Sequence, residues 1–322
     1  MVGRYLARRV AHAVVLLPIV SVLGFALTAV APGEFTDDMR LNPQISADTV
    51  QALRARYALD RPLPVRYAAW LRATLTGDLG FSLTYNMPVS ALFWPRARNT
   101  VILAAVATTA AWLLAVPLAI CSAARRGRAL DRMVMMITSV PLASSDLLIG
   151  LGALWLAARS GFFPTGGMTS VGFETMSGRE QWSDLRWHLM LPVAALTGIL
   201  LPPIFRQARA ALIDAMQSPH VQAAHAHGLS RATLLRAYVL PLAANAQISL
   251  LGLSMAGLLS ASLVIEVVMS WPGVGPLLLE ATLARDHHVV VGIVVVSAGL
   301  VWIANMIADA LLYVADPRIR AV

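Results

Sequence analysis

A polar segment that carries two arginines interrupts an otherwise apolar chain: Val221-Gln-Ala-Ala-His-Ala-His-Gly-Leu-Ser-Arg-Ala-Thr-Leu-Leu-Arg-Ala-Tyr-Val-Leu-Pro241. Residues 222–227 contain good helix formers, Gly228 can end that helix in the left-handed conformation, and Ser230 can cap the next one. Apolar residues then recur at helical spacing until Pro241 ends the pattern. The segment therefore predicts a helix, a turn and a second helix, which is more structure than a connecting loop needs.

The composition is that of a membrane protein. Of the 322 residues, 58% are hydrophobic and only 13% are charged, whereas soluble domains carry roughly 25% charged residues. We therefore expect the chain to lie in membrane lipid. The formal net charge of +8 comes from arginines that are dispersed among apolar spans, and this distribution does not fit a nucleic-acid partner.

The chain contains no lysine, and all 25 of its basic residues are arginine. A phosphate-binding P-loop and a pyridoxal enzyme each need a lysine. We therefore expect neither an ATP-binding P-loop nor a pyridoxal phosphate site in this chain. Any ATP that drives it must be bound by another subunit. The single Cys121 lies in an apolar span and cannot form an internal disulfide. No set of residues for covalent chemistry is evident, so the chain is not predicted to be an enzyme.

Six apolar segments are long enough to cross a membrane as helices. The first, 10–30, completes an N-terminal segment of residues 1–30. A cleaved signal peptide is the alternative, because Ala29-Val30-Ala31 has the form of a cleavage site, but an apolar run of 21 residues favours a full span. The other predicted spans are 100–124, 133–158, a short and kinked 188–205, 242–269 and 289–314.

The polar regions complete the predicted domain organisation. Residues 31–98 predict a small helical insertion, with helices near 46–57 and 65–75. Residues 99–314 form the transmembrane domain, with the loop 206–241 inside it, and residues 315–322 form a tail. The predicted fold is an all-α polytopic membrane protein with six transmembrane helices.

Arginine counts orient the predicted spans. The N-terminus, the 125–132 loop, the 206–241 loop and the tail hold thirteen arginines and three acids. The loops 159–187 and 270–288 hold four arginines and five acids. The positive-inside rule therefore places both termini and the 206–241 loop in the cytoplasm. The long 31–98 segment is then extracytoplasmic.

With this topology, the opening segment resembles a loop of ABC importer permeases. The family pattern is Glu-Ala-Ala, three residues, Gly, nine residues, Ile-x-Leu-Pro. Gln222 replaces the usual Glu and Tyr238 the usual Ile; the peptide branch of the family often lacks the Glu. The positions that the resemblance assigns to ATPase coupling are Gln222, Ala223, Ala224, Gly228, Leu229, Leu240 and Pro241.

Seven further stretches, in order along the whole chain, resemble the peptide/nickel permeases. They are Arg4-Tyr-Leu-x-Arg-Arg9, Leu59-Asp-Arg-Pro-Leu-Pro-Val-Arg-Tyr-Ala-Ala-Trp-Leu71, Gly77-Asp-Leu-Gly-Phe-Ser82, His188-Leu-Met-Leu-Pro192, Trp271-Pro-Gly-Val-Gly275, Arg285-Asp286 and Asp316-Pro-Arg-Ile-Arg320. The chain thus resembles the first of the two permease subunits of a dipeptide/oligopeptide/nickel ABC importer.

This resemblance implies a type I ABC importer permease of the bacterial inner membrane. The implied partners are a second homologous permease, two ABC ATPase subunits that bind ATP and Mg, and an extracytoplasmic solute-binding protein. The implied mechanism is alternating access, in which the 222–229 helix couples the permease to its ATPase. An ordinary amphipathic loop that lies on lipid is the alternative for that helix. Peptides are the expected substrate, while nickel, a metal chelate or an oligosaccharide remain open.

Four polar residues fall inside predicted spans. An ionised acid at the centre of a membrane costs roughly 2.5–3.5 kcal/mol, so Asp146 is expected to face protein or a watery path. Contact with substrate and a structural partner are both open for it. Glu266, and the pair Asn305 and Asp309 on one helix face, are expected to hold helices or subunits together.

Two surfaces are expected to contact partners. Gly252, Ala256 and Ser260 recur every four residues and form a small-residue ridge for the second permease. The 31–98 insertion and the Trp271 stretch are expected to gate the outer mouth or to dock the binding protein. The residues of this outer set are Asp60, Tyr67, Trp70, Gly77, Asp78, Trp271, Pro272, Gly273 and Gly275.

A different class of function stays open: a secondary transporter driven by an ion gradient through Asp146 and Asp309. A metal site is not predicted, because the histidines at 225 and 227 lie on the opposite side of the predicted membrane from those at 287 and 288.

Overall fold

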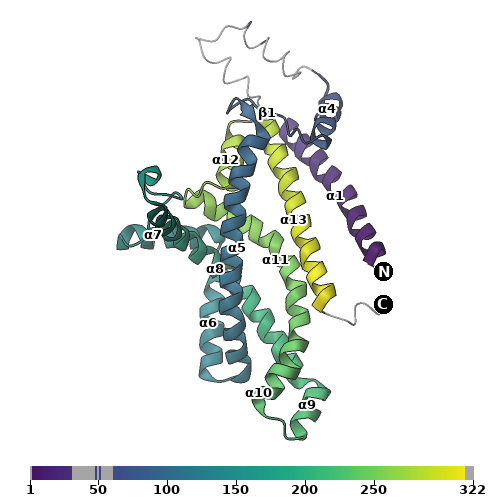
Figure 1. The fold of residues 1–322 in the computed structure, drawn as a ribbon, viewed down its shortest axis with the longest axis vertical. Coiled ribbons are helices and arrows are strands. Elements are labelled where there is room, and N and C mark those ends of the chain that lie inside the picture. The colour runs from purple at the N-terminus through teal and green to yellow at the C-terminus, as the bar shows by residue number, and fades with distance from the viewer. Residues whose placement is uncertain (1, 31–47, 49–50, 52–60, 316–322) are drawn as a thin grey trace. The chain divides into compact units, whose positions relative to one another are not determined.

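The computed structural model describes residues 2–30, 48, 51 and 61–315 (Figure 1). Asp60, most of the predicted 46–57 helix and the tail after residue 315 lie outside this range. So do the side chains of Gly252, Ala256 and Asp309.

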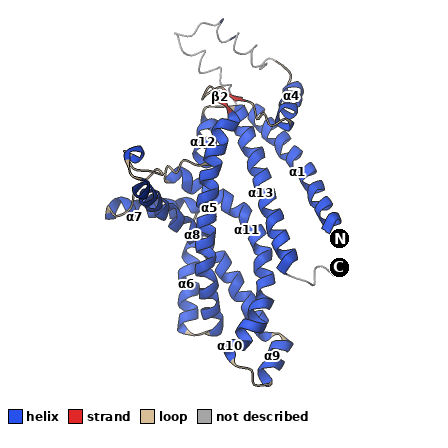
Figure 2. Cartoon of the chain, viewed as in Figure 1, coloured by secondary structure: helices blue, strands red, loops and turns tan. Residues whose placement is uncertain are grey.

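Helices make up almost all of the regular structure in the described residues (Figure 2). In chain order the elements are α1 (Val2–Val30), α4 (Leu63–Leu75), β1 (Phe81–Ser82), β2 (Met87–Pro88), α5 (Val89–Ala124), α6 (Ala129–Ala143), α7 (Asp146–Ser160), the 3₁₀ helix η1 (Phe173–Thr175), α8 (Gly178–Gln217), α9 (Pro219–Ala226), α10 (Arg231–Leu234), the π-helix η2 (Leu235–Val239), α11 (Leu240–Val268), α12 (Val274–Leu283) and α13 (His287–Ala315).

Four of the described helices are long and apolar enough to cross a membrane: α1, α5, α8 and α13. The pair α6 and α7 raises the number to five if it counts as one span. α11 contributes a shorter described apolar part, Gly257–Val268. The count of six spans therefore stays a prediction, with α11 as the remaining candidate.

The chain folds as two compact units. Unit 1 comprises Met1–Asn99 and Gly273–Trp302, and unit 2 comprises Thr100–Pro272 and Ile303–Val322. Unit 2 contains the segment between α8 and α11, and unit 1 contains the 77–88 turn and hairpin.

A row of small residues along α5 lies in the core of unit 2. They are five alanines that recur every four positions after the buried Leu103, so they share one helix face with it, and each is at most 5% exposed: Ala107, Ala111, Ala115, Ala119 and Ala123. Small side chains let a neighbouring backbone approach closely. The Thr197 hydroxyl of α8 donates a hydrogen bond to the Ala107 carbonyl over 3.4 Å.

The predicted span 133–158 is not one continuous helix, because the structure breaks it into α6 and α7, which are bent by 104°. Ser144 and Ser145 have extended backbones at the break. The Ser144 hydroxyl donates to the Val140 carbonyl over 2.9 Å, and the Ser145 hydroxyl accepts from the Leu148 N–H over 3.3 Å. The two serines thus satisfy backbone groups that the broken helices leave without partners.

α8 is much longer than the predicted span 188–205, and it also covers the first part of the predicted 206–241 loop. It has 40 residues and contains three prolines. A capping box starts it, in which the Ser177 N–H donates to the Glu180 carboxylate over 2.9 Å. Ser218, whose backbone is extended, ends it.

In unit 1, an aromatic cluster joins α1 to α4. The Phe25 ring lies 5.6 Å from that of Tyr67 and 6.2 Å from that of Trp70. The Ser21 and Tyr67 hydroxyls are hydrogen-bonded over 2.8 Å. α4 covers the helix predicted near 65–75. Ser21, to which Tyr67 of α4 is hydrogen-bonded, lies in the apolar second half of α1.

Candidate functional site

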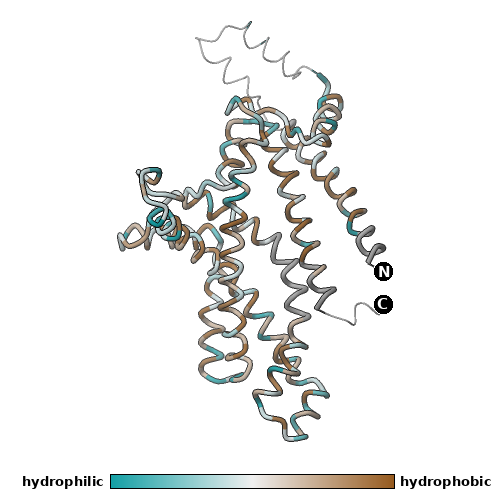
Figure 3. The backbone as a smooth tube through the Cα atoms, in the orientation of Figure 1, coloured by the Kyte–Doolittle hydropathy of each residue, from teal (hydrophilic) through white to brown (hydrophobic). Residues whose placement is uncertain are grey.

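The segment between α8 and α11 forms a compact helical unit at one end of unit 2 (Figure 1). α8 ends at Ser218, and Pro219 occupies the first turn of α9, where a missing N–H has no cost. Figure 3 shows hydrophilic residues around α9 and at the turn between α5 and α6, while apolar residues dominate the helices above them.

The two faces of α9 differ in exposure. Val221 and Ala224 are only 5% and 8% exposed, whereas Gln222 and Ala223 are exposed. The Gln222 side-chain amide donates to the Gln217 carbonyl over 3.0 Å. Of the predicted Gln-Ala-Ala coupling triplet, the first two residues therefore face outward, and Ala224 packs against the chain itself.

Gly228 ends this helix in the left-handed conformation, with φ of 81°. Its N–H donates to the His225 carbonyl over 3.0 Å. No atom lies within 4 Å of where a Cβ would be, so the backbone conformation, rather than lack of space, favours glycine here. Ser230 then caps α10 by accepting from the Thr233 N–H over 3.2 Å. Leu229 between them is 36% exposed.

Pro241 does not end the second helix, in contrast to the prediction. α10, η2 and α11 follow one another without a break, and Pro241 lies in the first turn of α11. A proline inside a helix has no N–H and its ring collides with the carbonyl four residues earlier. The π-helix η2, whose turn is wider, ends at Val239 and contains the position four residues before Pro241, where the α-helical hydrogen-bond pattern is interrupted. Leu240 is half-buried beside it.

A buried ion pair connects α6 to α8 near the same end of unit 2. Arg209 donates to both carboxylate oxygens of Asp131, over 2.7 Å each. Asp131 is 4% exposed and also accepts from the Gly127 N–H over 2.8 Å and from the Ser122 hydroxyl. The carboxylate thus holds the α5–α6 turn against α8.

Sequence reasoning missed this ion pair, because it counted Asp131 and Arg209 only as charges on the cytoplasmic side. A signal was present in the spacing of the two α8 arginines. Arg206 and Arg209 are three residues apart and share a helix face. Arg206 also contacts α6, where it donates to the Ser139 hydroxyl over 2.7 Å.

The polar residues of the predicted spans lie in different environments. Asp146 is half-buried at the first position of α7, not in the middle of a helix as predicted; a helix N-terminus favours a carboxylate. Glu266 is 0% exposed in α11, and its backbone carbonyl accepts from the Trp271 N–H over 2.8 Å. Asn305 is half-buried in α13, and the Asp309 side chain lies outside the described residues.

The predicted outer set is mostly buried. Trp70 and Trp271 are 4% and 1% exposed. Tyr67 is half-buried in the aromatic cluster of unit 1. Pro272 is half-buried, while Gly273 and Gly275 are buried. Among the described residues of this set, Gly77 and Asp78 are the exposed ones.

Two of the family-like stretches are joined within unit 1. Asp286 is 1% exposed and accepts from the Ser82 hydroxyl over 2.7 Å and from the Thr84 N–H over 3.1 Å. The Tyr85 hydroxyl donates to the Glu280 carboxylate. Burial, together with this acceptor, raises the pKa of Tyr85 to about 12. The β1–β2 hairpin is therefore held to the segment that joins α12 to α13.

Long apolar helices, together with a structured polar segment between two of them, define the class: a polytopic helical membrane protein. The chain belongs to the family described as binding-protein-dependent transport system inner membrane component, whose pattern matches residues 115–321. The N-terminal region of the same family matches residues 1–94.

Curated relatives match along nearly the whole chain. The oligopeptide transport system permease protein AppB of Bacillus subtilis is 30% identical over 318 residues, covering 98% of this chain and 99% of the relative. The dipeptide transport system permease protein DppB of Escherichia coli is 27% identical, covering 94% of each chain.

A solved structure supports the fold. The structure described as inward facing conformations of the MetNI methionine ABC transporter matches with a TM-score of 0.58 at 15% identity, covering 70% of this chain and 97% of that one. The chain therefore has the fold of a type I ABC importer permease. It is a multi-pass inner-membrane transport subunit, not an enzyme, and its family implies ATPase and substrate-binding partners.

Proposed function

We propose that this chain forms half of the translocation path of an ATP-driven peptide importer, and that α9 and the following turn receive the motion of the ATPase. The buried side of α9, at Val221 and Ala224, fixes the helix to its own chain. The exposed side, at Gln222, Ala223 and Leu229, leaves a surface for a partner. This two-sided arrangement carries the proposal.

The α9–α11 connection is suited to transmit movement. α9 follows α8 after the single residue Ser218, and α10 runs through η2 into α11 without a break. A displacement of α9 therefore acts on two long helices at once. Such rigid-body coupling of helices is a known way to switch between two arrangements of a packed protein.

The substrate assignment rests on the relatives, whose names specify oligopeptide and dipeptide transport. A metal chelate or an oligosaccharide is the alternative cargo. The proposed complex contains a second homologous permease, which completes the path within the lipid. Two ATPase subunits bind ATP and Mg in the cytoplasm. Both termini of this chain also lie in the cytoplasm. A solute-binding protein delivers substrate from the opposite side of the membrane. Gly77 and Asp78 are candidates for its contact.

Reconstitution into sealed vesicles tests this function. The two permeases are inserted with their ATPases and binding protein, and uptake of a labelled tripeptide is measured with ATP on the ATPase side. We expect uptake that requires both ATP and the binding protein. Uptake driven by a proton or sodium gradient without ATP would instead support the secondary transporter, and uptake of nickel chelate but not peptide would change the cargo.

A further inference from the structure

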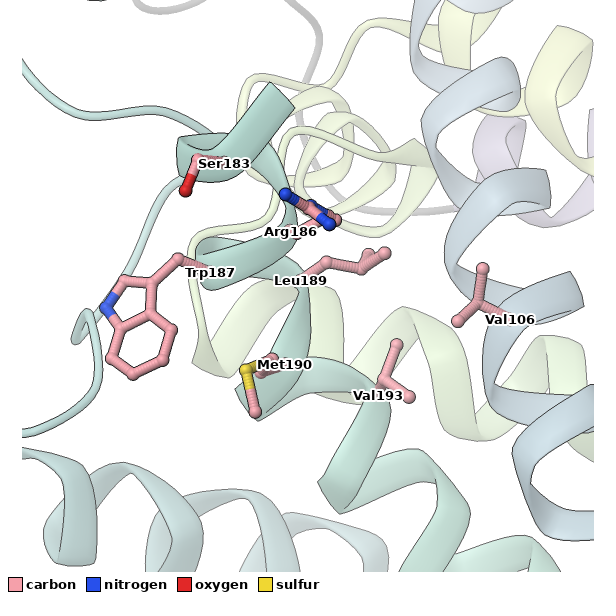
Figure 4. A pocket seen from close by; sticks show the side chains of 7 residues that line it. All are labelled: Val106, Ser183, Arg186, Trp187, Leu189, Met190 and Val193. Carbon is pink, nitrogen blue, oxygen red and sulfur yellow. The ribbon is translucent and has the colours of Figure 1, made fainter. Parts of the chain in front are cut away.

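A groove at the start of α8 differs from the segment proposed for ATPase coupling. It has a volume of about 480 Å³ and lies between α8 and α5, within unit 2. Its apolar wall consists of Val106, Leu189, Met190 and Val193, and its polar end consists of Ser183 and Arg186. Figure 4 shows Arg186, Leu189 and Val193 on the side of α8 that faces Val106.

Arg186 is exposed at the polar end of the groove. Its Nε–H donates to the Trp182 carbonyl one turn earlier, over 3.3 Å, which holds the guanidinium near the helix. The neighbouring carboxylates bind other groups: Glu180 accepts from Ser177, and Asp184 accepts from the Ser170 N–H and hydroxyl. No carboxylate of the described residues forms an ion pair with Arg186. The groove therefore has a positive charge at one end.

Aromatic residues surround this end of the groove. Trp182 and Trp187 are 70% and 37% exposed. The Trp187 ring lies 5.5 Å from that of Phe163, nearly parallel, and 5.2 Å from that of Phe162. Exposed tryptophans in a membrane protein gather at the depth of the lipid headgroups. This tendency predicts headgroup depth for Arg186 and a deeper position for Val193, two turns further along α8.

From this arrangement we propose that the groove binds one phospholipid, with its phosphate on the Arg186 guanidinium and one acyl chain along Leu189, Val193 and Val106. A guanidinium offers paired N–H donors to a phosphate. The aliphatic wall of Val106, Leu189 and Val193 presents no polar group to an acyl chain, so both ends of the groove match the two parts of the same ligand.

Native mass spectrometry of the purified and delipidated permease complex tests the proposal, with dioleoyl phosphatidylglycerol as the probe. The Arg186→Gln variant should weaken the tightest lipid-binding event about tenfold, since a hydrogen bond to a charged group has this worth. Arg179→Gln is the matched control: it removes an exposed arginine from the first turn of the same helix, outside the groove. It should leave binding unchanged.

Further variants and ligands test the apolar wall, the phosphate contact and the possibility that protein covers the groove. Val193→Trp fills the apolar wall without changing the charge and should also weaken binding. Dioleoylglycerol, which lacks phosphate, and glycerol phosphate, which lacks chains, should each bind at least tenfold more weakly than the intact lipid. Equal losses in Arg186→Gln and Arg179→Gln would overturn the proposal, as would glycerol phosphate that binds as tightly as the lipid. So would efficient cross-linking of Met190→Cys to the second permease in a Cys121→Ser background, because protein would then cover the groove.

Discussion

Arg209 of α8 donates hydrogen bonds to both oxygens of the buried Asp131 carboxylate, over 2.7 Å each, although the two residues are 78 positions apart in the sequence. The same carboxylate accepts from Ser122 and from the Gly127 N–H. One ion pair thus fixes the end of α5, the turn and the start of α6 to the part of α8 that precedes α9. The proposed coupling helix therefore follows a braced section of α8.

Removing one partner of this ion pair should destabilise the protein strongly. Arg209→Ala leaves the Asp131 carboxylate buried without its cation, a change that typically costs 3–5 kcal/mol. We expect a markedly lower midpoint of thermal unfolding for the purified complex. Arg126→Ala, which removes an exposed arginine from the adjacent turn, is the control. The double variant Asp131→Leu with Arg209→Met should recover much of the stability that Arg209→Ala loses. An Arg209→Ala protein with an unchanged unfolding midpoint would show that the ion pair is dispensable.

Gly228→Ala should reduce coupling more than folding. An L-residue in the left-handed conformation costs about 1–2 kcal/mol, and relaxing this strain would shift α9 relative to α10. Gly161→Ala is the matched control, because Gly161 has φ of 64° and also has no atom within 4 Å of a Cβ position. Both variants should show similar melting temperatures.

Stimulation of the ATPase by the loaded binding protein separates these two glycine variants. We expect it to fall in Gly228→Ala and to persist in Gly161→Ala. Equal stimulation in the two variants would remove the special role of the turn at Gly228.

The contact between α7 and α11 predicts opposite outcomes at two glycines of one helix. A Cβ at Gly150 would lie 2.8 Å from Cδ1 of Ile265, which is 0% exposed, while a Cβ at Gly152 meets nothing within 4 Å. Gly150→Leu should therefore destabilise the protein by about 1–3 kcal/mol through overpacking. Gly152→Leu should be neutral or stabilising, since leucine favours helix. Thermal unfolding of both variants measures this, and the reverse order would mean that α7 packs differently.

The Asp286 carboxylate should be essential for the hairpin of unit 1. Asp286→Ala removes the acceptor of the Thr84 N–H and of the Ser82 hydroxyl; Ser82 is 0% exposed, and a buried group without a partner costs about 1–3 kcal/mol. Asp78→Ala is the control, since the exposed Asp78 accepts only a local bond from the Gly80 N–H, over 2.9 Å. A smaller loss for Asp286→Ala than for Asp78→Ala, measured by thermal unfolding, would contradict this role.

Sequence reasoning succeeded where the chemistry is local. The turn at Gly228 and the cap at Ser230 follow from backbone preferences of single residues. It failed at the break between α6 and α7, because both sides of the break are apolar and hydropathy does not distinguish a bent pair from one span. Ser144, Ser145 and the preceding Pro141 were the local signal.

Contacts between residues that are distant in the sequence could not be predicted, because sequence patterns do not specify which distant residues meet. Ser82 and Asp286 both lie in stretches that resemble the family, but nothing in the pattern pairs them across 204 residues. Similarly, the aromatic residues of the expected outer set are recognisable in the sequence. The burial of Trp70 and Tyr67 depends on packing against α1 and α13, and that of Trp271 on the core of unit 2, which spacing alone does not specify.

Site-directed cross-linking tests the central claim most directly, that the exposed face of α9 contacts the ATPase. Single cysteines replace Ala223, on the exposed face, or Ala224, on the buried face, in a Cys121→Ser background, and the complete complex is treated with a short bifunctional reagent. We expect Ala223→Cys to cross-link to the ATPase and Ala224→Cys not to do so. No cross-link from Ala223→Cys, in a complex that still transports peptide, would contradict the account.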